Sequence, residues 1–168
     1  MRHPALRAPA VSVDPGASLG VLCTLGYSGL RGADDLRALL HDTPVDTIVD
    51  VRLSPYSGNR AFSTGMRRTV EAAGFAYVHI PDLGNLAYKT GGTQIRNLEA
   101  IEAVLMMLRA GQSVALLCVC AQPKDCHRWT LAQAALDREP ALRVVHLLTR
   151  PEPGLTTPQP THASASTD

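Results

Sequence analysis

The chain has 168 residues, of which 45% are hydrophobic and 18% are charged. This length suffices for one buried core and is too short for two large ones. The formal net charge is +1, so no overall field steers the protein toward nucleic acid or anionic lipid, and any polyanion site must be local. The longest apolar run, residues 114–121, is far shorter than the roughly 20 residues that span a bilayer. We therefore expect no membrane partner.

The first half of the chain alternates short apolar runs with amphipathic segments. Residues 21–27 form an apolar run closed by a Ser-Gly pair, and residues 34–40 follow with leucines at helical spacing. Residues 47–53 are rich in β-branched side chains and end before a proline, which is typical of a strand. Residues 66–73 then predict a helix stopped by glycine, and residues 75–80 predict a third strand.

The second half repeats the alternation more clearly. Residues 98–110 carry leucine and isoleucine on one helical face, with a glycine just past the end. Residues 113–120 are apolar on both faces, as expected of a central parallel strand. Residues 126–136 predict a helix and residues 143–148 a fifth strand.

This order predicts an α/β fold with a three-layer sandwich, in which helices cover both faces of about five mostly parallel strands. The arrangement would be Rossmann-like or flavodoxin-like. In such open sheets ligands bind beyond the carboxyl ends of the strands, near the point where strand order reverses. Polar and reactive residues are concentrated after the strands of this sequence, so we expect a functional site at that edge.

The two ends of the chain differ in composition from the middle. From Pro151 onward the sequence consists mainly of Pro, Thr, Ser and Ala, which cannot bury enough apolar surface to offset the entropy of ordering. We expect a disordered tail at 150–168, a flexible arm at 1–18, and a single α/β domain at 19–149. The first 18 residues lack the continuous apolar core of a signal peptide, so we expect a cytoplasmic protein.

The tripeptide at 126–128 combines a thiol, an imidazole and a guanidinium. Cys126 lies at or near the start of a predicted helix, where unpaired N–H groups favour an anion and would promote ionisation of the thiol. His127 and Arg128 would lower its pKa further, and Arg128 could hold an anionic ligand. This pattern favours Cys126 and His127 as catalytic residues. The alternative is that Cys126 is a small buried residue and its neighbours bind loops.

The cysteines allow two other interpretations. Cys118 and Cys120 point to the same face of their strand, so either could form a reversible disulfide with Cys126. Cys118, Cys120, Cys126 and His127 also provide four metal ligands, but their spacing matches no familiar zinc motif. We therefore expect no cofactor and no metal ion. With Cys23, the four cysteines lie in or beside predicted strands and do not form a secreted disulfide framework.

Asp50 and Arg52 share a face at the end of the second predicted strand. A buried acid needs a partner, so Asp50 would pair with Arg52, Arg128 or a backbone donor. That pair is either structural or catalytic, with Asp50 orienting an arginine that holds a carboxylate or phosphate. Four further side chains at this edge are candidate substrate contacts, although each also has an ordinary role in a turn or core: Tyr27, Ser28, Ser57 and His79.

Several motifs in a fixed order carry a family resemblance. They are Thr24–Ser28, Val49–Arg52, Tyr77–Pro81, Leu116–Cys118, Cys126–Arg128 and Val145–Leu147. Together they resemble domain-of-unknown-function family 488, over about residues 23–148. The resemblance implies a small, soluble, bacterial-type α/β domain without an established reaction. It also implies that Asp50, Arg52, Cys118, Cys126, His127 and Arg128 are signature positions.

The chain departs from the family pattern at two places. Cys120 stands where the family usually has an acid. If that acid is a general base or a metal ligand, this chain has either lost it or replaced it with a thiolate. The stretch at 85–93 also differs from the glycine and basic residues that are usual there, which affects any substrate contact from that loop.

Three functions remain open from the sequence. The leading hypothesis is an anion- or phosphate-binding site, with thiol-dependent enzymatic chemistry, for a small anionic ligand or nucleotide. A second is a non-catalytic nucleotide or nucleic-acid binding module, and a third is a thiol redox site. Surface arginines that would extend a nucleic-acid patch are Arg31, Arg60, Arg67, Arg68 and Arg96. Whether the protein is an enzyme and how many copies assemble are not predicted.

Overall fold

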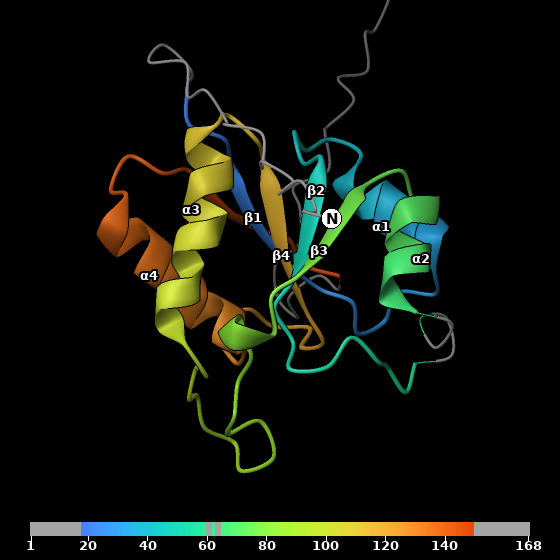
Figure 1. Ribbon diagram of the computed structural model, residues 1–168. Helices are drawn as coiled ribbons and strands as arrows, with labels where there is room; N and C mark the ends of the chain where they lie inside the picture. Colours follow the sequence, from blue (N-terminus) through green and yellow to red (C-terminus); the bar gives the residue numbers. More distant parts are fainter. Residues whose placement is uncertain (1–17, 60–61, 63–64, 150–168) are drawn as a thin grey trace, which may run out of the picture.

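The computed structural model of the protein describes residues 18–59, 62 and 65–149 (Figure 1). The expected flexible arm lies outside these residues apart from Ser18, and the expected disordered tail at 150–168 lies wholly outside them. The described part of the chain forms one central sheet with helices on either side.

Five strands form the sheet, in the order β3-β2-β4-β1-β5. All four neighbouring pairs are parallel. The strands are β1 (Leu22–Gly26), β2 (Thr47–Asp50), β3 (Ala76–His79), β4 (Val114–Cys118) and β5 (Val144–His146). Their near-continuous apolar character fits a sheet that is buried on both faces.

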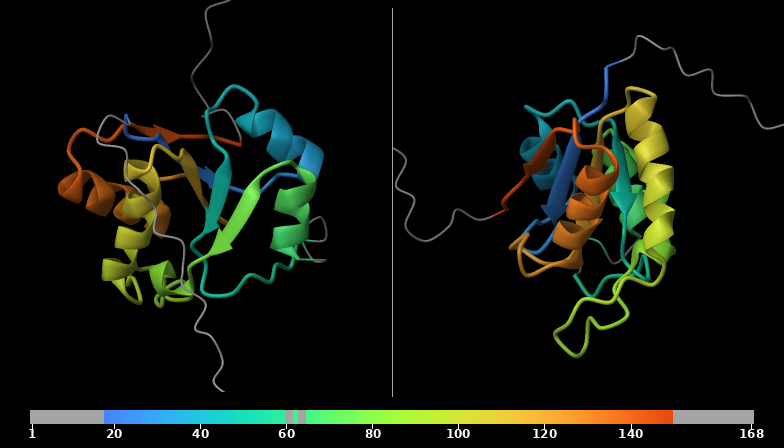
Figure 2. Two further views of the ribbon diagram at one scale, coloured as in Figure 1. Left: turned by 45° about the horizontal axis from the view of Figure 1, so that its top comes forward. Right: turned by 90° about the vertical axis from the view of Figure 1, so that its left-hand side faces the viewer.

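In the described part of the chain, four α-helices cover the sheet, two on each face (Figure 2). α1 (Ala33–Leu40) and α2 (Met66–Ala72) lie on one face, and α3 (Ile101–Arg109) and α4 (His127–Arg138) lie on the other. Two short 3-10 turns, η2 (Pro81–Leu83) and η3 (Leu98–Ala100), flank the long loop before α3. The predicted three-layer α/β fold is confirmed. Among the described residues, no helix has the length and apolar character needed to cross a membrane.

Strand β4 shows how the two cores are separated. Leu116 faces the core formed with α3 and α4, whereas its neighbour Leu117 faces the core formed with α1 and α2. Both leucines are fully buried, and each such side chain contributes roughly 1.5–3 kcal/mol through burial. The central strand is therefore held firmly from both sides, and its carboxyl end is a rigid platform.

The position of β4 creates a crevice at the carboxyl edge of the sheet. β4 pairs with both β1 and β2. The chain leaves β4 toward α4 on one face, but leaves β1 and β2 toward α1 and α2 on the other face. Neighbouring connections thus diverge on both sides of β4, which is the topological switch point where open α/β sheets bind ligands.

Candidate functional site

A cavity of about 790 Å³ opens at this carboxyl edge. Its walls come from four stretches of chain, within residues 27–29, 52–59, 85–93 and 118–127. The first, second and fourth stretches follow β1, β2 and β4, and the third belongs to the loop that projects beyond the edge in Figure 2. The fold therefore brings segments that are far apart in sequence to one hollow.

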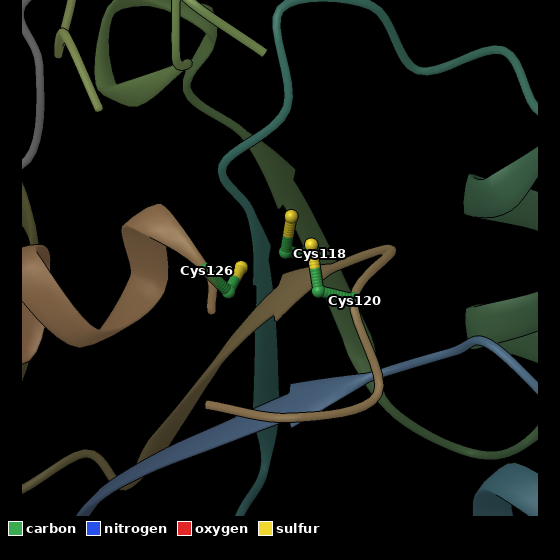
Figure 3. A group of neighbouring side chains, drawn as sticks. All are labelled: Cys118, Cys120 and Cys126. Carbon is green, nitrogen blue, oxygen red and sulfur yellow. The ribbon is translucent and has the colours of Figure 1, made fainter. Parts of the chain in front are cut away.

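Three cysteines converge at this cavity (Figure 3). Cys118 ends β4, Cys120 lies in the following loop, and Cys126 is the N-cap residue of α4. Their sulfur atoms all lie within 4.8 Å of one another. Cys118 and Cys126 are each 5% exposed, whereas Cys120 is only partly buried. Cys120 therefore offers the most accessible sulfur of the cluster.

His127 lies against this cluster with a fixed ring orientation. Its Nε2 atom is 2.9 Å from the carbonyl oxygen of Val51, which can only accept, so Nε2 carries the proton and donates it. Its Nδ1 atom is 3.6 Å from Cys118 Sγ and 3.8 Å from Cys126 Sγ. Burial alone would lower the pKa of His127, but the contacts with Cys126 and the Val51 carbonyl outweigh it and raise the pKa.

The three thiols differ in how readily they ionise. The pKa of Cys120 is lowered, because its sulfur accepts hydrogen bonds from Cys118 and Cys126 and lies near the Arg128 charge. The pKa of Cys118 is raised by its hydrogen bond to Cys120, and that of Cys126 by hydrogen bonds to both other thiols and by burial. The negative charge of the cluster therefore concentrates on Cys120, whereas the sequence had favoured Cys126.

The guanidinium of Arg52 is fully engaged with protein atoms. Nε and Nη2 donate to the two carboxylate oxygens of Asp50, at 2.8 and 2.6 Å. Nη2 also donates to the Pro55 carbonyl, and Nη1 donates to Tyr27 Oη and the Tyr56 carbonyl. Each of the five N–H groups of an arginine thus has a partner here. The expected pair with Asp50 is present, and Arg52 has no uncommitted donor for an anion.

Asp50 is the centre of this buried network. It is fully buried and also accepts a hydrogen bond from Tyr77 Oη at 2.7 Å. His79 Nε2 lies 2.8 Å from the Arg52 carbonyl oxygen. Neither Asp50 nor His79 lines the cavity, so within the described residues both act by shaping the turn after β2. Tyr77 carries no signal of this role in the sequence, because its contact with Asp50 depends on the pairing of β2 with β3.

Arg128 lies beneath the loop that carries Cys120. It is fully buried and does not line the cavity. Its Nη1 and Nη2 atoms donate to the carbonyl oxygens of Cys120 and Ala121, while its Nε has no hydrogen-bond partner among the described residues. Gly26 allows the same loop to approach β1, since a Cβ atom there would lie 1.7 Å from the Cys120 oxygen. Arg128 and Gly26 therefore position Cys120.

The other predicted contact residues do reach the cavity wall. Tyr27, Ser28 and Ser57 all line it. Tyr27 Oη donates to Ser57 Oγ at 3.0 Å, and the Ser28 backbone N–H donates to the Val119 carbonyl. These contacts join the loop after β1 to those after β2 and β4.

The loop at 85–93 supplies wall residues that the sequence analysis did not name as site residues. Asn85 is 9% exposed, and its amide nitrogen donates to the Gly92 carbonyl at 2.8 Å. Its side-chain oxygen accepts from the backbone of Ala87 and Gln94. Tyr88, on the same loop, lines the cavity and is largely exposed. The signals that could have identified this ordered turn are Asn85 directly after Gly84 and the glycine pair at 91–92.

Most of the surface arginines considered for nucleic-acid binding are paired with acids in the described structure. Three of them form ion pairs with nearby carboxylates: Arg31 with Asp35, Arg67 with Glu71, and Arg96 with Asp82. Arg60 lies outside the described residues. Exposed pairs of this kind contribute little to stability and leave less charge for phosphate.

Comparison with known proteins agrees with the motifs in the sequence. No curated protein matches the chain. The matched family segment reaches from α1 to the loop after η2, so it includes the Asp50–Arg52 pair and ends before the cysteine cluster. Residues 33–91 match the model of the family Domain of unknown function DUF488, which confirms the family resemblance seen in the sequence.

Proposed function

We propose that the cavity is the site of a thiol-dependent reaction in which the sulfur of Cys120 attacks a small ligand. One observation carries the proposal: three cysteine sulfurs lie within 4.8 Å of one another at a cavity, and one of them is accessible. Clusters of reactive groups in a concave site are the usual mark of catalysis. The Cys118 and Cys126 thiols support Cys120 from the buried side.

The reaction is nucleophilic attack by sulfur. The sulfur of Cys120 forms a bond to an electrophilic atom of the ligand, and the leaving group departs with the electron pair of the broken bond. Such chemistry requires reduced thiols, and all four cysteines are free. We therefore propose that the protein works in a reducing compartment such as the cytoplasm.

The cavity wall indicates what kind of ligand the site would hold. A ligand in the cavity would meet the side chains of Tyr27, Ser57 and Tyr88, which line its wall. Because Arg52 donates all its N–H groups to protein atoms, an anionic ligand such as phosphate would depend on Lys124, an exposed cation on the wall. Binding of an anionic ligand in this cavity would therefore require Lys124.

The test is the rate at which iodoacetamide alkylates each cysteine of the reduced, chelator-treated full chain. Sulfur displaces iodide from this reagent, and peptide mass spectrometry resolves the four sites. We expect Cys120 to react at least about tenfold faster than Cys23, which is 1% exposed in the opposite core and becomes accessible only through local opening. Equal rates would refute the proposal.

A second arm tests the ligand class. Inorganic phosphate should slow the alkylation of Cys120 if the ligand is anionic, and Lys124→Ala should remove this protection. Protection by phosphate that persists in the variant would refute a role for Lys124, and no protection would limit the proposal to neutral polar ligands.

A redox function is a second candidate, favoured by the distance between Cys120 and Cys126. Their sulfur atoms are within 4.8 Å, and a disulfide would require them to close to about 2.05 Å. With oxidised glutathione as oxidant, two thiols would lose two protons and two electrons while the reagent becomes two glutathione thiols. A disulfide-linked peptide containing both residues would support this function, and alkylation of all cysteines after treatment would refute it.

A further inference from the structure

We propose that Cys118, Cys120 and Cys126 bind a thiophilic divalent cation of the zinc type through three thiolates. The fourth coordination position would open to the cavity. This inference goes beyond the proposed function and shares only the cavity with it, because a bound ion would occupy the sulfur atoms that the thiol reaction uses in the metal-free chain.

The geometry of the three sulfur atoms fits such an ion. Tetrahedral coordination with Zn–S bonds of about 2.3 Å places neighbouring sulfurs about 3.8 Å apart. The sulfurs of Cys118, Cys120 and Cys126 all lie within 4.8 Å of one another, so no pair has to close by more than about 1 Å. Figure 3 shows the three side chains directed to a common region from β4, the loop and the start of α4.

The backbone holds the three cysteines in place without a metal ion. The Cys118 carbonyl accepts from the Tyr27 backbone N–H at 3.0 Å, and the Cys126 N–H donates to the Pro123 carbonyl at 3.0 Å. The Cys120 carbonyl accepts from Arg128. Because each ligand residue is anchored by its own hydrogen bond, little ordering entropy opposes binding, and the site is preorganised.

The chemistry of the donors selects the class of ion. Thiolate is a soft ligand that prefers zinc-type ions over magnesium or calcium, which take oxygen. Three thiolates carry three negative charges, which strongly favour a divalent cation in a partly buried place. His127, whose Nε2 donates to the Val51 carbonyl, presents its Nδ1 atom to the sulfurs of Cys118 and Cys126.

The open fourth position follows from the cavity. All three cysteines line it, so a bound ion would face the hollow. Three protein ligands and one exchangeable position are typical of catalytic zinc sites, whereas structural sites are closed by four protein ligands. An ion here would therefore contact a ligand in the cavity directly.

The test is titration of the reduced, metal-free full chain with Co²⁺ alone, followed by absorption spectroscopy. Cobalt bound by thiolates gives a sulfur-to-metal charge-transfer band and visible bands typical of four-coordination. We expect one Co²⁺ per chain, displaced by Zn²⁺. Cys120→Ala should weaken binding by more than the roughly 10- to 100-fold that loss of an outer-shell partner costs, whereas Cys23→Ala, on the other core, should leave it unchanged.

Two results would overturn the inference. One is the absence of a charge-transfer band in the wild-type chain, and the other is a band that survives in Cys120→Ala at the wild-type affinity. If a variant fails to fold, alkylation of the wild-type chain with and without Zn²⁺ provides the same information. Zn²⁺ should block alkylation of the three clustered cysteines together. Alkylation that Zn²⁺ does not affect would refute binding.

The outcome is independent of the test of the proposed function, which uses metal-free protein. Fast alkylation of Cys120 without cobalt binding refutes the metal site and leaves the thiol reaction standing. Cobalt binding with slow alkylation refutes the reaction and leaves the metal site standing.

Discussion

Replacement of Gly26 by alanine should distort the loop that carries Cys120. A Cβ atom at position 26 would lie 1.7 Å from the Cys120 carbonyl oxygen and 3.0 Å from Arg128 Nη1. Real Cβ atoms do not approach backbone oxygen so closely, so the loop has to move away from β1. The move would also weaken the hydrogen bond from Arg128, whose charge is fully buried.

The magnitude follows from the cost of overpacking a close-packed site. We expect Gly26→Ala to lower the free energy of unfolding by about 1–3 kcal/mol. In a chain of this size, each kcal/mol lowers Tm by roughly 2–4 °C. Gly58→Ala is the matched control, since a Cβ there would meet no atom of the described residues within 4 Å. Thermal unfolding followed by circular dichroism measures both. Equal Tm values for the two variants would refute the role assigned to Gly26.

Three further predictions concern the buried polar groups. Asp50→Asn should lower the free energy of unfolding by about 3–5 kcal/mol, because it leaves the buried Arg52 without its counter-charge. Urea unfolding measures this change. A decrease below about 1 kcal/mol, as for an exposed ion pair, would contradict the prediction. Tyr77→Phe removes the hydroxyl that donates to Asp50 and should cost about 1.5–3 kcal/mol in the same assay, and a neutral effect would argue against that hydrogen bond. Burial lowers the pKa of His146, and the charge of Arg128 lowers it further. The unfolded chain therefore protonates His146 at a higher pH than the folded chain does, so the free energy of unfolding should fall as pH drops below about 6.5. A His146→Gln variant whose stability falls equally steeply would contradict this.

Most secondary structure could be predicted from local patterns, and the differences have local causes. The strand expected at 47–53 ends at Asp50, because the Arg52 backbone N–H donates to the Asp50 carboxylate at 3.1 Å and turns the chain. The helix expected from Leu98 begins with a 3-10 turn, where the Asn97 side chain accepts from the Glu99 N–H. Side-chain hydrogen bonds of this kind compete with regular structure.

From the sequence alone, the location of the site could be predicted only as far as the carboxyl edge of the sheet. Apolar runs predict where the strands lie in the sequence but not their order in the sheet. The insertion of β4 between β1 and β2 decides which loops come together at the cavity. The contact of His127 with the Val51 carbonyl and that of Arg128 with the loop of Cys120 both depend on this order. The sequence grouped Arg128 with an anion site by its residue type, whereas its burial makes it a support of the loop.

The central claim is that the accessible sulfur of the cysteine cluster faces the cavity and reacts there. The most direct measurement is a crystal structure of the metal-free chain after brief treatment with iodoacetamide. We expect an added group on Cys120 Sγ, inside the cavity beside Tyr27 and Ser57, with the thiols of Cys118 and Cys126 unmodified behind it. A Cys120 side chain that carries no added group, or that points to solvent away from the other two sulfurs, would contradict it.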